Sequence, residues 1–102
     1  MNRRRTEELV LCILDALHGK ACRILRYASG TAASPAETEI AVLTPYRISE
    51  DEEQRLSDAV FRFNAAHGES VSVVDVDVRS FEERRDGTPF YREIGRGVTL
   101  WP

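Results

Sequence analysis

Two short apolar runs, separated by a stretch of small residues, constrain the fold of this chain most strongly. The first run spans residues 21–27 and the second spans residues 39–44, directly before Pro45. Residues 28–38, which lie between them, are small or polar and offer no large side chain to bury. Short apolar runs bounded by such residues are typical of strands. We therefore predict two strands joined by a loop.

Helical and strand patterns surround this pair. A stripe of apolar residues at helical spacing predicts a first helix, and it comprises Leu9, Val10, Ile13, Leu14 and Leu17. Ser49 and Glu52 have the spacing of a capping box and predict the start of a longer helix that ends before Gly68. Alternating valines over residues 70–78 predict a third strand.

The remaining third of the chain predicts shorter elements. Residues 80–85 read as a short helix or a turn, residues 89–96 as a helix with proline near its first turn, and residues 98–101 as a final strand. The predicted order is α-β-β-α-β-α-β. The fold class is thus α/β (α+β), with helices packed on a small mixed β-sheet. A chain of 102 residues suits one domain, so we expect a single domain over residues 1–102.

Composition argues against several classes of function. The net charge is −3, and the basic cluster at positions 3–5 is too short to form a nucleic-acid-binding stripe. No run approaches the roughly 20 apolar residues of a membrane span. Glu7, Glu8 and Asp15 closely flank the apolar residues 9–14, and no cleavage site for a signal peptide follows them. We expect a cytoplasmic protein that binds neither nucleic acid nor a membrane.

Two segments carry a resemblance to a known family. Ser29 and Gly30 follow the first strand, and Glu39-Ile40-Ala41 opens the second. This frame resembles the minimal nucleotidyltransferase domain, in which a Gly-Ser turn leads to an Asp-x-Asp pair on the next strand. The tail over residues 90–100 is similar to that family's ending, where an aromatic pair and an isoleucine precede a Gly-Val-x-Leu strand.

The resemblance implies a site for nucleotidyl transfer, in which Mg²⁺ ions bridge carboxylates and the phosphates of ATP. The implied nucleotide-binding residues are Ser29 and Gly30: Ser29 matches the family's serine, Gly30 stands where the family often has arginine, and Ala28 replaces the family's glycine. Glu39 matches the first aspartate of the pair, whereas Ala41 replaces the second and cannot bind a metal. Asp75 or Asp77 would supply the carboxylate of the third strand, and the sequence leaves that choice open. The implied catalytic and metal-binding residues are therefore Glu39, Asp75 and Asp77, which are vestigial if the protein is inactive.

Two functions follow from this resemblance. In the first, the chain is a degenerate, inactive nucleotidyltransferase-fold protein. It has no cofactor and acts by binding another protein. The smallest family members are often antitoxins of a HEPN-domain RNase toxin, so the implied partner is a HEPN-domain protein, with homodimerisation as an alternative. In the second, Glu39, Asp75 and Asp77 with Mg²⁺ and ATP transfer AMP to a protein partner. A third interpretation makes these carboxylates ordinary solvated strand residues. The aromatic residues near the C-terminus are candidates for a binding patch, and they are Phe90, Tyr91 and Trp101. For Phe90 and Trp101, packing in the core is the more common role of such residues.

Overall fold

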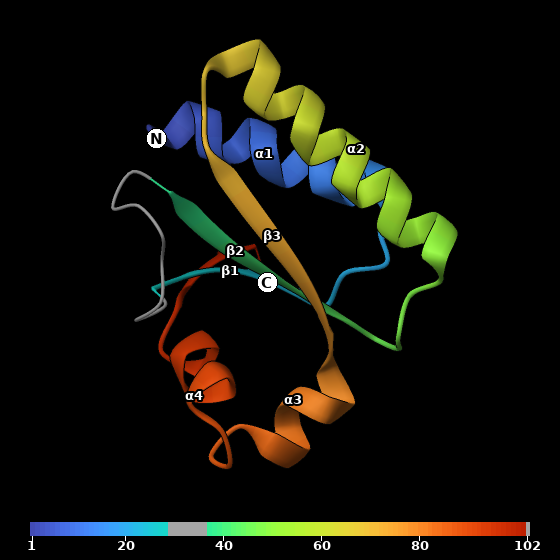
Figure 1. Cartoon of the computed structure of the whole chain (residues 1–102), viewed down its shortest axis with the longest axis vertical. Coiled ribbons are helices and arrows are strands. Elements are labelled where there is room, and N and C mark those ends of the chain that lie inside the picture. The colour runs from blue at the N-terminus through green and yellow to red at the C-terminus, as the bar shows by residue number, and fades with distance from the viewer. Residues whose placement is uncertain (29–36, 102) are drawn as a thin grey trace.

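The computed structural model describes residues 1–28 and 37–101. In that part of the chain, four strands form one mixed sheet in the order β3-β2-β1-β4 (Figure 1). They are β1 (Arg23–Tyr27), β2 (Thr38–Thr44), β3 (Val71–Asp77) and β4 (Val98–Trp101). β1 pairs antiparallel with both β2 and β4, whereas β2 and β3 are parallel. The parallel pair needs a crossover connection, which the longest helix provides.

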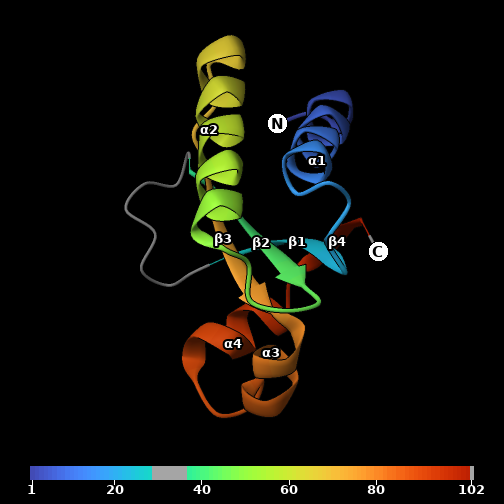
Figure 2. The same ribbon diagram turned by 90° about the vertical axis from the view of Figure 1, so that its right-hand side faces the viewer.

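Helices cover both faces of the sheet. α1 (Arg3–Ala16) and α2 (Glu50–His67) lie over one face, and α3 (Val78–Arg84) and α4 (Pro89–Gly95) lie over the other. Figure 2 shows the sheet between these two helical layers. The predicted class, an α+β fold with a small mixed sheet, is confirmed. The observed order is α-β-β-α-β-α-α-β, because the segment expected as a helix or turn forms α3.

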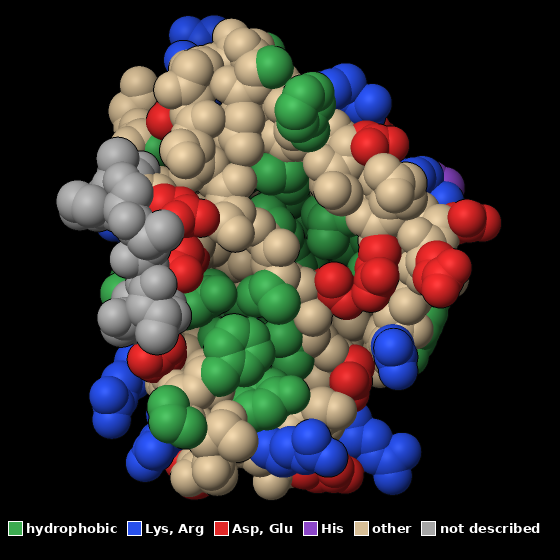
Figure 3. Space-filling view, in the orientation of Figure 1, with side chains coloured by type: hydrophobic (Ala, Val, Ile, Leu, Met, Phe, Trp, Pro, Cys, Tyr) green, Lys and Arg blue, Asp and Glu red, His purple; other side chains and the backbone are tan. Residues whose placement is uncertain are grey.

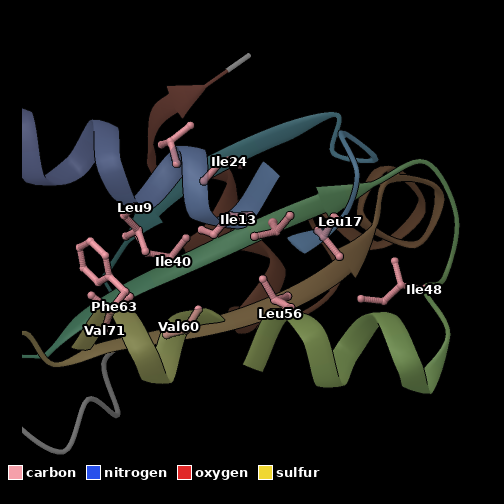
Figure 4. Packing of buried hydrophobic residues seen from close by; sticks show 12 residues of the cluster. Leu9, Ile13, Leu17, Ile24, Ile40, Ile48, Leu56, Val60, Phe63 and Val71 are labelled. Atoms are coloured by element: carbon pink, nitrogen blue, oxygen red, sulfur yellow. The ribbon is translucent and has the colours of Figure 1, made fainter. Parts of the chain in front are cut away.

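The sheet has a hydrophobic core on each face. Ile24, Ile40 and Val42 point toward α1 and α2, where they pack with Leu9, Ile13 and other residues of the larger cluster (Figure 4). The neighbouring residues in the strands point the other way and form a smaller cluster under α3 and α4, which consists of Leu25, Ala41, Leu43, Val76, Phe81 and Ile94. Burial on both faces explains why residues 40–44 are continuously buried rather than alternating.

Local signals fix the bounds of α2. The Ser49 hydroxyl accepts a hydrogen bond from the backbone N–H of Glu52, and the Glu52 carboxylate accepts one from the N–H of Ser49. This confirms the predicted capping box, which satisfies two N–H groups that the helix cannot pair internally. Gly68 ends the helix with a φ of 63°, a left-handed conformation that glycine adopts without steric cost. Within the described residues, no helix is both long and apolar enough to cross a membrane.

Candidate functional site

Glu39 lies on the α3/α4 face of the sheet. It is directly opposite Tyr27 in the β1–β2 register, and Tyr27 packs against the smaller hydrophobic cluster. Ala41, two residues further along β2, is buried in the same cluster. Burial raises the pKa of Tyr27, and the negative charge of Glu39 raises it further. The matched positions of the family's carboxylate pair therefore share one face, as strand alternation requires.

Asp75 lies on the opposite face. Its register partner on β2 is Val42, which belongs to the larger cluster under α1 and α2. Asp75 lines a pocket there together with Leu56 and Val60 of α2. The β3 residue in register with Glu39 is Ser72, and the one in register with Ala41 is Val74. On the face where Glu39 lies, β3 thus presents the hydroxyl of Ser72 and the apolar side chain of Val74 at these two positions.

Asp77 has a structural role at the end of β3. It is the N-cap of α3, and its Oδ1 accepts a hydrogen bond from the backbone N–H of Ser80 at 2.8 Å. This hydrogen bond lowers the pKa of Asp77, since it favours the charged carboxylate. A carboxylate committed to a helix cap is poorly placed to bridge a metal to a nucleotide.

The three carboxylates that the sequence singled out are not brought together. Glu39 is on one face, Asp75 is on the other, and Asp77 caps a helix. Among the described residues, no group of three or more His, Cys, Asp or Glu side chains could hold a metal ion. The donor set that the family's Mg²⁺ chemistry requires is therefore not assembled from these residues. Ser29 and Gly30, the expected nucleotide-binding turn, lie outside the described residues.

Comparisons with known proteins identify a solved structure that shares the fold of this chain. No family model matches the chain, and no curated protein matches it. A solved structure of tri-AMPylated Shewanella oneidensis HEPN toxin in complex with MNT antitoxin does match, with a TM-score of 0.63. The match covers 99% of this chain and 72% of that chain at 16% sequence identity. This chain has the fold of the MNT antitoxin. The resemblance to minimal nucleotidyltransferases is thus confirmed in the fold.

The aromatic residues of the tail separate into two groups on this MNT-like fold. Phe90 is 39% exposed, and its ring meets those of Tyr27 and Tyr91 at centroid distances of 6.3 and 5.3 Å. Phe90 and Tyr91 line a pocket beside Val74 and Val76 of β3. Trp101 is half-buried and packs against the larger cluster on the far side of the sheet. The aromatic pair of α4, rather than Trp101, therefore adjoins β3.

Proposed function

We propose that this chain is an inactive nucleotidyltransferase-fold protein that acts by binding a protein partner, in the manner of an antitoxin. The observation that carries this proposal is the separation of Glu39 and Asp75 onto opposite faces of the sheet. In the solved complex, the protein that shares this fold binds a HEPN toxin. The proposed partner is accordingly a HEPN-domain protein, and we place the complex in the cytoplasm.

The chemistry of Mg²⁺ supports the absence of transfer. Mg²⁺ demands near-octahedral oxygen ligands, so several carboxylates must converge from neighbouring strands. Here Ala41 and Val74 occupy adjacent ladder positions where a converging pair would stand, and both side chains are hydrocarbon. Loss of such ligands costs several kcal/mol of transition-state stabilisation, or on the order of 10³-fold or more in rate.

Protein binding needs none of these ligands. A specific complex requires a complementary surface of roughly 1,200–2,000 Å² in total, which a domain of this size can supply. A fold retained without its metal site is consistent with selection for such a surface. An inactive antitoxin of this kind would neutralise its toxin by covering it.

The test is co-expression of the chain with HEPN-domain proteins from the same genome. We expect rescue of growth, a complex that survives size-exclusion chromatography, and a partner whose intact mass is unchanged. A mass increase of the partner by one or more AMP groups, lost in Glu39→Ala, would establish the active alternative and overturn the proposal. Neutralisation without a complex would also overturn it.

A further inference from the structure

The outer edge of β3 is open in the described part of the chain. β3 is the first strand of the sheet and pairs there with β2 alone (Figure 1). Its sequence, Val-Ser-Val-Val-Asp-Val-Asp, is rich in valine and has strong strand propensity. An open strand edge presents a row of unpaired backbone groups and is a template for pairing with another strand.

Asn64 of α2 shows which backbone groups face this edge. Its Nδ2 donates to the carbonyl oxygen of Val71, and the N–H of Val71 donates to its Oδ1, both at 3.0 Å. The carbonyl of Ser70, one residue earlier, instead accepts from the N–H of Thr38 at the inner edge. Because backbone groups of successive strand residues point to alternate edges, Val73 and Asp75 direct theirs outward, as Val71 does.

The open edge is therefore short and bounded. Asn64 occupies the position at Val71, and the cap of α3 ends the strand at Asp77. Between them, Val73 and Asp75 offer two N–H donors and two carbonyl acceptors. A partner segment of a few extended residues would satisfy all four groups.

A pocket flanks the edge on each face of the sheet. On the α2 side, a hollow of about 410 Å³ has Val60, Phe61 and Val73 among its walls. On the α4 side, a hollow of about 350 Å³ is lined by Phe90 and Tyr91 with Val74 and Val76. Figure 3 shows hydrophobic side chains gathered in these two places, between α2 and β3 and beside α4. Alternate side chains of an added strand would enter the two hollows in turn.

The charges beside the edge are mainly negative. Glu53 and Asp75 line both pockets, and Asp77 lines the second. Among the residues that line the two pockets, Arg47 is the one cation. A strand laid on this edge would thus lie beside the carboxylates of Glu53 and Asp75.

We propose that the β3 edge binds an extended segment of a partner protein, in which apolar side chains alternate with lysine or arginine. This inference rests on the proposed protein-binding function and names the surface and the chemistry of the partner. The open groups of Val73 and Asp75 supply the main-chain hydrogen bonds, the two hollows take the apolar side chains, and the carboxylates attract the basic ones.

A second copy of this chain fits the edge less well. Antiparallel pairing of β3 with itself about Val74 would bring Asp75 and Glu53 of both copies into one narrow strip. Like charges placed close together at an interface oppose association. A charge on an edge strand is also a common device against self-pairing. Charge complementarity therefore selects a basic partner segment over a second copy.

Two substitutions at one position test the proposal. Asp75→Pro removes the outward N–H, and proline is tolerated on an edge strand where the N–H faces away from the sheet. Asp75→Ala removes the charge but keeps the N–H. The probes are nine-residue peptides selected by phage display from a random library against the immobilised full chain. Their affinities for both variants and the wild type are then measured by fluorescence anisotropy.

We expect the selected peptides to alternate apolar and basic residues. Asp75→Pro should weaken them about tenfold or more, since a buried acceptor loses its donor. Asp75→Ala should weaken them only a few-fold. If Asp75→Pro fails to fold, peptides N-methylated at alternate residues replace it, and one of the two registers should lose binding while the other retains it.

Three outcomes of these binding experiments would overturn the edge proposal. They are a library that yields no binder, peptides that bind Asp75→Pro as tightly as the wild type, and a wild-type dimer that Asp75→Pro dissociates. The proposed function can fail separately, because the peptide selection uses no HEPN-domain protein. Rescue of growth that persists in Asp75→Pro would also overturn the edge proposal, while the proposed function would stand. Peptide binding at the edge without rescue of growth would support the edge proposal and overturn the proposed function.

Discussion

Glu39 and Asp75 lie on opposite faces of the same sheet. Glu39 is in register with Ser72 of β3, and Asp75 is in register with Val42 of β2. Each carboxylate therefore belongs to a different layer of the molecule, with the buried β-strands between them. Strand alternation fixes the face on which each side chain stands, and this separates the two carboxylates.

This separation predicts the outcome of a nucleotide titration. Calorimetric titration of ATP with Mg²⁺ into the full chain should give no metal-dependent heat at millimolar nucleotide, compared with an EDTA control. The physical reason is that Ala41 and Val74 place hydrocarbon side chains beside Glu39 on the sheet, whereas Mg²⁺ requires several converging oxygen ligands.

If the titration does show metal-dependent binding, two variants identify the face on which the nucleotide binds. Glu39→Ala and Asp75→Ala form the matched pair for this purpose. Metal-dependent binding that Glu39→Ala abolishes and Asp75→Ala spares would show that the α3/α4 face still recognises a nucleotide. That result would revive transfer as a function of this chain.

Much of the fold could be predicted because its signals are local. Ser49 and Glu52 specify the start of α2 within one helical turn, and Gly68 specifies its end. The valines of β3 and the apolar run of β2 identify strands by their residue types alone. These signals depend on neighbours within a few positions, which a sequence displays directly.

The candidate site could not be predicted because it depends on register between strands. The sequence does indicate that Asp75 and Val74 lie on different faces of the sheet, because successive residues of a strand alternate. The β3 residues that lie on the same face as Glu39 are set by the pairing of Ala41 with Val74. These two residues are 33 positions apart, and no local pattern encodes their contact. A slip of one residue would move every side chain to the other face.

Gly97 is expected to tolerate no side chain. A Cβ there would lie 2.7 Å from the carbonyl oxygen of Arg26 and 3.0 Å from that of Ile94, and both are backbone atoms. Gly97→Ala should therefore lower the free energy of unfolding by about 1–3 kcal/mol, as overpacking does. Urea denaturation followed by circular dichroism measures it. Gly87→Ala is the control, because its Cβ would approach Arg84 no closer than 3.5 Å; equal effects of the two changes would contradict the prediction.

Glu52 should make stability depend on pH. It accepts hydrogen bonds from the backbone N–H of Ser49 at 3.0 Å and from Lys20 at 3.2 Å, and these lower its pKa from an ordinary value of 4.5. A depressed pKa in the folded state gives stability that is present above the unfolded pKa and lost as the pH falls through the folded one. Glu52→Gln should thus destabilise the protein at pH 7, and the difference from the wild type should shrink in acid.

Urea denaturation at pH 7 and at about pH 3 measures this difference. Glu53→Gln, at the exposed neighbouring position, serves as the control and should have a small effect at both pH values. A penalty for Glu52→Gln that is the same at both pH values would assign the role of Glu52 to packing rather than to its charge.

Asn64 should contribute both stability and protection of the β3 edge. Its side-chain amide pairs with the N–H and the carbonyl of Val71, as a neighbouring strand would. Asn64→Ala leaves both groups without this partner and should lower the free energy of unfolding by about 1–2 kcal/mol. Asn64→Asp is the matched variant, because it keeps the acceptor for the N–H but places an acceptor oxygen, in place of the donor, against the carbonyl of Val71. Both variants should be less stable than the wild type, and wild-type stability in both would show that Val71 does not depend on this pairing. Hydrogen exchange of the Val71 amide, measured by NMR, should accelerate in Asn64→Ala while the amide of Val74, which faces β2, stays protected.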